Sequence, residues 1–187
     1  MATSASGRAR QARRRGRARL GPRDHRRCQR PREKGGSATG PNPVDRGKTE
    51  SKLHILTEAN GLPLSVAVSG ANTHDMNALR PLVHAIPPVR SRRGPRRRRP
   101  DKLHADKGYD YDDLRCWLRT RNIVPRIART GVESSSRLGR YRWRVERSFS
   151  WLLNHRRLAL RWERKASNFT GFLTLAAALT CYKNIPK

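Results

Sequence analysis

Acidic residues are scarce in this chain. Its 187 residues include 14 Asp and Glu against 43 Lys and Arg, which gives a formal net charge of +29. Such a charge makes a polyanion the expected partner, because lysine and arginine displace the counterions that condense on phosphates. The chain has no basic amphipathic helix with a broad apolar face, so we expect no membrane partner.

Cysteine is also rare, and the three cysteines lie far apart at Cys28, Cys116 and Cys181. The spacing of the cysteines and histidines excludes a zinc module, and the cysteine usage indicates a reduced, intracellular protein. Long apolar runs are absent: the most apolar stretch, residues 169–179, is shorter than the ~20 residues that cross a bilayer. The arginine-rich N-terminus has no apolar segment of the kind found in a secretory signal. We therefore expect a cytoplasmic protein.

Large apolar residues are almost missing from residues 1–34, which are rich in arginine. Such a segment cannot bury enough surface to offset the loss of chain entropy, so we expect low order there. A glycine- and proline-rich loop continues to Thr49. The sequence therefore predicts a basic, low-order N-terminal segment over residues 1–50 and a folded domain over residues 51–187.

From residue 51 onward, the hydrophobic pattern predicts strands alternating with helices. The expected strands cover residues 52–57, 62–69, 103–105 and 123–128, the first two joined by a hairpin turn at Asn60-Gly61. The expected helices cover residues 76–86, 111–121, 140–163 and 169–182, the first with Asp75 as its N-cap. This order predicts an α/β fold.

Two acids stand at positions that suggest chemistry. Residues 103–105 form a short buried strand that delivers Asp106 at its C-terminal end, where sites in α/β sheets are built. Glu146 lies on the flank of the apolar stripe of the expected helix 140–163. Together they suggest metal-assisted chemistry on an anionic substrate. Two simpler roles stay open: Asp106 can cap its turn, and Glu146 can pair with Arg142, a bridge worth only ~0.3–0.5 kcal/mol.

Basic residues gather in two further places, over residues 90–99 and over residues 156–164. The run over residues 90–99 is a flexible loop that leads into the strand ending at Asp106, so a phosphate backbone held there would lie beside that carboxylate. Such contacts position DNA but carry no sequence information directly. The candidate DNA-binding residues are Arg92, Arg93, Arg96, Arg97, Arg98, Arg99, Lys107, Arg156 and Arg157.

Several motifs, taken in order, resemble one protein family. A strand, an Asn-Gly turn and a second strand are followed by Asn72-Thr73-His74-Asp75, Ala105-Asp106-Lys107-Gly108-Tyr109-Asp110 and Tyr141-Arg142-Trp143-Arg144-Val145-Glu146-Arg147. Over residues 35–187 this series resembles the insertion-sequence DDE transposases, ribonuclease H-like enzymes encoded by bacterial mobile elements. Single matches of this kind are weak, but the motifs in this order are quite specific.

The resemblance implies three carboxylates that hold two divalent cations, Mg²⁺ or Mn²⁺, for DNA strand cleavage and strand transfer. Asp106 matches the second acid and Glu146 the third, so both are candidate catalytic residues and metal ligands. Arg142 matches a family arginine that would orient Glu146 or hold a phosphate oxygen. Two Mg²⁺ about 3.5–4 Å apart would activate the attacking oxygen and stabilise the leaving one.

The same resemblance names partners and a location. The expected partners are DNA, as the terminal inverted repeats of a mobile element and its target, and a second copy of the chain in a homodimer. The expected location is the bacterial cytoplasm, in association with the nucleoid.

The sequence departs from the family pattern in two places. Gly139 and Leu153 stand where the family has a tyrosine and a lysine, although Arg156 could replace the lysine. More seriously, the first catalytic acid of the family lies on a strand shortly before the Gly35-Gly36 pair. Residues 23–32 occupy that place, and their composition is not that of a core strand.

A frameshift would explain this departure. One choice of codons from Asp24 onward, read one nucleotide later, encodes Ile-Ile-Asp-Gly-Val-Ser-Val-Arg-Ala, which is such a strand. We hypothesise that residues 1–34 are out of frame and that Arg26 stands in the place of the lost aspartate. Asp24 and Asp45 are weak substitutes because both lie in loop-like sequence.

The expected fold is thus α/β, a ribonuclease H-like mixed sheet flanked by helices, with its first strand missing or disordered. The expected function is that of a truncated or frameshifted transposase, weakly active or inactive. A non-catalytic basic nucleic-acid-binding protein is the alternative, and a related nuclease with the same fold is another.

Overall fold

The computed structural model describes residues 17–20, 29–31, 36–43, 46–89, 95–129 and 135–184, with only the backbone for residues 17–20, 29–31 and 135–142. The described strands form one seven-stranded mixed sheet. They are β1 (Arg17–Leu20), β2 (Gln29–Pro31), β3 (Gly40–Pro41), β4 (Thr49–Thr57), β5 (Pro63–Gly70), β6 (Lys102–Ala105) and β7 (Val124–Ile127). The helices are α2 (Met76–His84), η2 (Lys107–Tyr109, 3-10), α3 (Asp112–Thr120), α4 (Ser135–Leu153), α5 (Arg156–Ala159) and α6 (Ala166–Lys183).

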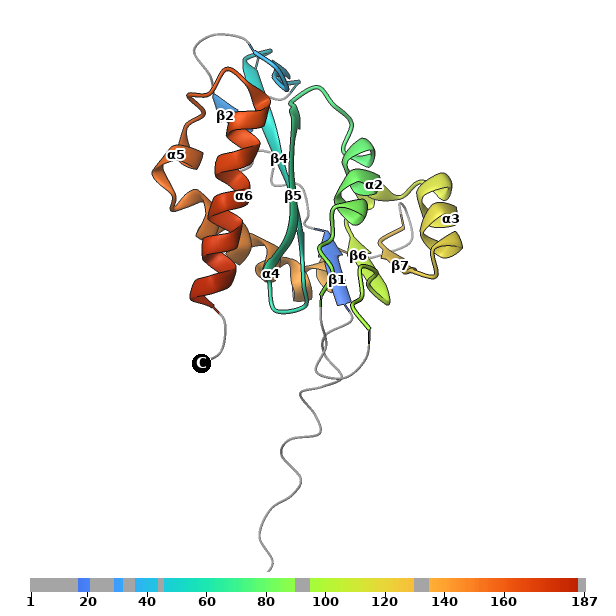
Figure 1. Cartoon of the computed structure of the whole chain (residues 1–187). Coiled ribbons are helices and arrows are strands. Elements are labelled where there is room, and N and C mark those ends of the chain that lie inside the picture. The colour runs from blue at the N-terminus through green and yellow to red at the C-terminus, as the bar shows by residue number, and fades with distance from the viewer. Residues whose placement is uncertain are drawn as a thin grey trace, which may run out of the picture.

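Strand β4 is the longest described strand and organises one half of the sheet. It pairs with β5 as an antiparallel hairpin from Ser51 to Thr57, and with β1 and β2 antiparallel along its other edge. Strand β1 is parallel to β6, and β6 is parallel to β7. The sheet therefore runs β5-β4-β1-β6-β7 across the molecule (Figure 1).

The expectation of a missing first strand is wrong for this structure. Residues Arg17–Leu20 form β1 in the middle of the sheet, with Arg19 opposite Thr57 on one side and His104 on the other. The physical reason is that β4 and β6 both need a partner for their facing N–H and C=O groups, and backbone pairing requires no particular side chain. Residues 1–16, 21–28, 32–35 and 44–45 of the predicted low-order segment lie outside the described residues.

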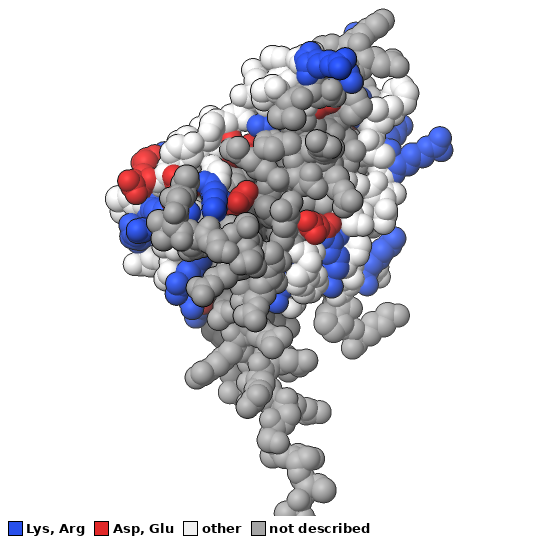
Figure 2. Space-filling model, turned by 180° about the vertical axis from the view of Figure 1, so that it is seen from behind, with Lys and Arg blue, Asp and Glu red and all other residues white. Residues whose placement is uncertain are grey.

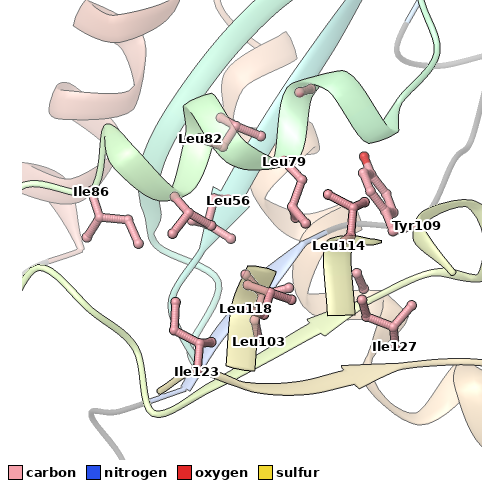
Figure 3. Close-up of a cluster of buried hydrophobic side chains, with 13 residues drawn as sticks. Leu56, Leu79, Leu82, Ile86, Leu103, Tyr109, Leu114, Leu118, Ile123 and Ile127 are labelled. Atoms are coloured by element: carbon pink, nitrogen blue, oxygen red, sulfur yellow. The ribbon is translucent and has the colours of Figure 1, made fainter. Parts of the chain in front are cut away.

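One face of the sheet is covered by α2 and α3 (Figure 1). The amphipathic spacing of these helices buries the predicted leucines, including Leu79 and Leu82 of α2 and Leu114 and Leu118 of α3, all 1% exposed or less. They pack against Leu103 of β6 in one hydrophobic core (Figure 3). This core holds β6, and therefore its C-terminal end, in a fixed position.

The other face is covered by α4, α5 and α6. Leu53 and Ile55 point to this side of β4, as the alternation of a strand requires, and pack against Leu152 of α4 and Phe169 of α6. The four side chains are 4% exposed or less. In the parts of the chain that the structure describes, no helix combines the length and the apolar character needed to cross a bilayer.

The expected single helix over residues 140–163 is wrong. The chain leaves the helical path after Leu153, makes the short helix α5, and then runs irregularly to Ala166. Arg161 explains the break, because this residue is 2% exposed and its guanidinium donates to the carbonyl oxygens of Ser37 (2.7 Å) and Ala38 (3.0 Å). A continuous helix would point this side chain elsewhere and leave those carbonyls without this donor.

Candidate DNA-processing site

Asp106 stands where the sequence places it, directly after β6. It is the N-cap of η2, and its Oδ1 accepts a hydrogen bond from the backbone N–H of Lys107 at 2.6 Å. The capping role left open from the sequence is therefore real. A cap of this kind holds the carboxylate in one orientation at the tip of the strand, so it does not compete with a functional role.

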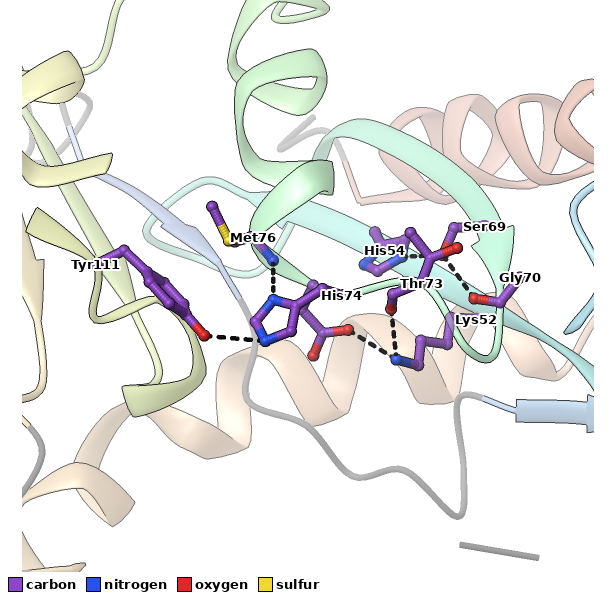
Figure 4. A network of polar contacts seen from close by, with 9 residues as sticks. Lys52, His54, Ser69, Gly70, Thr73, His74, Met76 and Tyr111 are labelled. Atoms are coloured by element: carbon purple, nitrogen blue, oxygen red, sulfur yellow. Dashed lines mark hydrogen bonds and ion pairs between the residues drawn. The ribbon is translucent and has the colours of Figure 1, made fainter. Parts of the chain in front are cut away.

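The loop between β5 and α2 brings a buried ion pair to the same face of the sheet. Lys52 on β4 donates to Oδ1 of Asp75 at 3.1 Å and to the carbonyl of Thr73 at 2.8 Å (Figure 4). Asp75 is 3% exposed, and its side chain makes no capping bond to α2. Asp75 is the N-cap residue of α2, as predicted, but its carboxylate pairs with Lys52 instead of accepting a capping hydrogen bond.

His54 lies beside this pair on β4. It is 7% exposed, and its Nε2 is 2.8 Å from Oγ of Ser69 on β5. Burial lowers the pKa of His54 to about 4; the charge of Asp75 raises that pKa and the charge of Lys52 lowers it. The imidazole is therefore neutral at physiological pH and acts as a structural hydrogen-bonding group there.

A second histidine joins this loop to the segment that carries Asp106. Nδ1 of His74 accepts from the N–H of Met76 at 3.3 Å, so the neutral ring carries its proton on Nε2. Nε2 then donates to the hydroxyl oxygen of Tyr111 at 2.9 Å, with the two rings edge to face (Figure 4). This contact ties the start of α2 to the turn between Asp106 and α3.

Arg115 fixes the same turn from the other side. Arg115 is 6% exposed, and its Nε and Nη2 donate to Oδ1 of Asp110 at 2.8 and 2.5 Å. The same Nη2 donates to the carbonyl of Ile127 at the end of β7, at 2.9 Å. The segment from Asp106 to Asp110 is therefore bound to both neighbouring elements.

Glu146 lies on α4, as expected, and is exposed. Its helix is held by the turn between β4 and β5: Arg147 donates to the carbonyl of Asn60, and Ser148 to that of Gly61. Gly61 has a φ of +88°, and an added Cβ would lie 2.8 Å from the carbonyl oxygen of Arg144. The side chain of Arg142 lies outside the described residues.

The strand register separates the elements that carry the two acids. Thr57 is level with His104, so the turn that holds α4 lies towards the start of β6, whereas Asp106 follows its end. For the carboxylates of Asp106 and Glu146 to meet, the side chain of Glu146 would have to extend from the turn between β4 and β5 towards the C-terminal end of β6. Among the described residues, no group of three or more His, Cys, Asp or Glu side chains could hold a metal ion.

The basic candidates are also divided between the two ends of β6. Val89, which precedes the basic run over residues 90–99, pairs with Arg97 of that run through two backbone hydrogen bonds of 2.8 and 2.9 Å. The exposed residues Arg96–Arg99 lead into β6 at its start, roughly 13 Å along the strand from Asp106. Lys107 lies at the tip itself. Arg92 and Arg93 lie outside the described residues.

The remaining candidates, Arg156 and Arg157, are exposed on α5. Arg157 pairs with Glu163 at 3.1 Å. Basic side chains are spread over the rear of the molecule with acidic ones among them (Figure 2). The described contacts therefore gather Lys107 with Asp106, but leave the two arginine groups on separate elements.

Comparison with known proteins decides the family. The sequence model described as "Transposase DDE domain" matches residues 19–181. The chain belongs to the DDE transposase family. It is 48% identical over 147 residues to the putative transposase for insertion sequence element IS402 of Burkholderia cepacia, covering 79% of this chain and 70% of that protein. It is 30% identical over 135 residues to the putative transposase for insertion sequence element IS6501 of Brucella ovis, covering 69% of this chain and 95% of that protein.

Family membership supports a function in transposition, with DNA as the partner. It also suggests an enzyme that cleaves and transfers DNA strands with a divalent metal. For this DDE transposase, sequence reasoning missed the buried roles of Lys52 and Arg115. Lys52 could have been found because polar residues recur at alternate positions of a buried strand, but nothing local marks Arg115, whose partner Asp110 lies outside its helix.

Proposed function

We propose that this transposase-family chain binds DNA through its basic surfaces and cleaves or transfers strands weakly or not at all. One observation carries the proposal. The central strand β1 reads Arg-Ala-Arg-Leu and has no acid, although the resemblance puts the first catalytic aspartate on the first strand. A two-metal centre needs clustered carboxylates, so a chain that lacks one of three should lose most of its metal-dependent chemistry.

The mixed sheet is consistent with a ribonuclease H-like fold, which we include in the proposal. Within it, Asp106 and Glu146 are the acids that would hold a divalent cation, and Arg142 would orient Glu146 or a phosphate oxygen. Carboxylate oxygens are the ligands that Mg²⁺ prefers, and the cation would neutralise phosphate charge and activate an oxygen nucleophile. Because two acids alone bind such an ion weakly, the complete metal centre does not fit the described residues.

A frameshift remains our explanation for the lost aspartate. The family match begins at residue 19, inside β1, and therefore includes part of the segment that the hypothesis assigns to another frame. Asp24 and Asp45 lie outside the described residues. The nucleotide sequence around codons 20–36 tests the hypothesis directly: a shifted frame without an Ile-Asp-Gly strand would end it.

DNA binding is tested first with a random-sequence duplex at several salt concentrations. Replacing Arg98 and Arg99 by glutamine should weaken binding on all sequences and reduce the slope of log K against log salt by about 0.9 for each phosphate that the variant no longer neutralises. Replacing the exposed Arg119 of α3 and Arg121, the residue that caps its C-terminus, makes the same change in net charge and serves as the control. Equal effects of the two pairs would show that net charge alone, and not the arginine run, binds DNA.

Catalysis is tested with a duplex that carries the ends of the mobile element, in Mg²⁺ or Mn²⁺. We expect cleavage close to background. Cleavage that Asp106→Ala abolishes would overturn the proposed inactivity. Equal affinity for element ends and scrambled DNA, without cleavage, would favour the alternative, a basic nucleic-acid-binding protein without transposition specificity.

A further inference from the structure

Two short strands lie along one edge of β4. Strand β5 occupies the opposite edge from Ser51 to Thr57. Strand β1, which pairs with residues 56–57, and β2, which pairs with residues 50–52, therefore share the remaining edge. In the part of the chain that the structure describes, no strand lies between them beside residues 53–55. We call this edge of β4, over residues 50–57, together with the facing edge of β6, the strand slot.

The pairing of β1 shows which level of the strand slot lies beside Asp106. Leu20 pairs with Leu56 of β4, so the next position of a strand in this register is level with Ile55. Strand β1 also runs parallel to β6, and the same next position is level with Asp106. Paired residues of neighbouring strands lie about 5 Å apart and point to the same side of the sheet. An acidic side chain at this level would therefore lie beside Asp106.

The pairing of β2 shows which residue belongs at this level. Gln29 pairs with Lys52 of β4. A continuous strand in the register of β2 would place its position 26 level with Ile55, and hence with Asp106. The shifted frame puts the lost aspartate at this same position 26. Backbone pairing, which does not depend on the family motif, thus selects the same position.

The side chains beside the strand slot are buried and apolar on both faces of the sheet. Leu56 and Leu103 lie in the core beneath α2 and α3, and Leu53 and Ile55 lie in the core beneath α4 and α6. A strand covered on both faces needs apolar residues for both. The resident strands read Arg-Ala-Arg-Leu and Gln-Arg-Pro, and the proline has no N–H to donate. The shifted-frame strand Ile-Ile-Asp-Gly-Val-Ser-Val-Arg-Ala instead begins with two isoleucines, one for each face.

We propose that the strand slot binds an extended peptide of this pattern in trans, and that the peptide displaces β1 and β2 and brings its aspartate beside Asp106. Recognition is by strand addition: backbone hydrogen bonds to β4 and β6 provide affinity, and burial of the apolar side chains selects the sequence. The occupant is the shifted-frame strand itself, so the proposal rests on the frameshift within the proposed function. The resident strands compete with it because they are tethered to the slot.

Fluorescence anisotropy of the labelled shifted-frame peptide with the full chain measures this binding. We expect saturable binding at least about tenfold tighter than that of a scrambled peptide of the same composition. Arg19→Pro removes a backbone donor from β1 and should tighten peptide binding at least about threefold. Arg19→Ala removes the same charge, keeps the donor and should bind the peptide like the parent chain. If a folded Arg19→Pro chain binds no more tightly than Arg19→Ala, the peptide adds to another strand edge and the proposal is refuted.

The aspartate of the peptide reports its position, and this comparison carries the test if Arg19→Pro does not fold. Without divalent cations, a peptide with asparagine in its place should bind several-fold tighter, because two neighbouring carboxylates repel each other. Mg²⁺ should reverse this order, since carboxylate oxygens are its preferred ligands. Asp106→Asn should abolish both differences. Asp101→Asn makes the same change in charge at the other end of β6 and should leave them unchanged. Equal effects of the two variants would refute the position.

DNA binding is measured on the same samples, so that the two proposals fail separately. A chain that binds duplex DNA but does not distinguish the shifted-frame peptide from the scrambled one would refute the strand slot and leave the proposed DNA binding intact. A chain that binds the peptide selectively but not the duplex would support the strand slot and overturn the proposed DNA binding.

Discussion

Protonation of His54 should destabilise this protein over a defined pH range. Burial lowers the pKa of His54 from 6.5 to about 4 in the folded chain. Between these two values the unfolded chain binds a proton at this site and the folded chain does not. The free energy of unfolding is therefore highest above pH 6.5 and falls as the pH falls towards 4.

The size of the effect follows from the shift. One pKa unit corresponds to about 1.4 kcal/mol, so the whole displacement of His54 is worth about 3 kcal/mol between pH 6.5 and 4. The structure also gives the direction of two smaller effects. Lys52 lowers the pKa of His54 and Asp75 raises it. Lys52→Met should therefore raise the pKa of His54 and make the loss of stability smaller, because the loss still begins near pH 6.5 but is complete at a higher pH.

Urea unfolding followed by circular dichroism at pH 7.0, 6.0, 5.0 and 4.5 measures this quantity (values chosen to cover most of the range between the two pKa values, roughly half a unit to one unit apart). His54→Gln removes the titrating group but keeps hydrogen-bonding atoms near Ser69. The parent chain should lose about 2–3 kcal/mol more than His54→Gln over this range. His155→Gln, in the turn before α5, controls for the loss of a histidine. If the parent chain and His54→Gln have parallel pH profiles, the reasoning from burial fails.

Two further predictions concern the supports of the site. Gly61→Ala should destabilise the chain by more than Gly47→Ala, measured by urea unfolding: both have positive φ, which costs about 1 kcal/mol, but only at Gly61 does the new Cβ meet a backbone atom, whereas at Gly47 it meets nothing. Equal losses of stability for the two variants would mean that α4 can move away from the new Cβ of residue 61 without cost. Arg115→Met should cost about 3 kcal/mol because it leaves the carboxylate of Asp110 without its buried partner. Arg97→Met breaks only an exposed pair and should change stability by less than ~0.5 kcal/mol in the same urea unfolding experiments; a similar loss for both would show that burial does not matter here.

The elements from residue 51 onward were largely readable from the sequence, because periodicity and turn residues are local. The Asn60-Gly61 turn, the inward leucines of α3 and the position of Asp106 after a buried strand were all predicted and confirmed. The family was predicted too and is confirmed by its sequence model. The predicted roles of Asp106, Glu146 and Arg142 in catalysis stay predictions.

Three features were decided only by contacts between distant parts of the chain. Arg17–Leu20 became the central strand because β4 and β6 present open backbone groups there, which no local pattern reveals. Helix α4 ends at Leu153 and does not continue to residue 163, because Arg161 binds the carbonyls of Ser37 and Ala38.

The third feature is the arrangement of the site. The sequence by itself determined that the arginine run precedes β6 and that Asp106 follows it. The tertiary structure alone decided that His74 and Arg115 hold the segment after Asp106, through Tyr111, Asp110 and the carbonyl of Ile127. The physical reason is that side-chain periodicity selects helices and strands locally, whereas backbone hydrogen bonds between strands set the position of each element and are nearly independent of sequence.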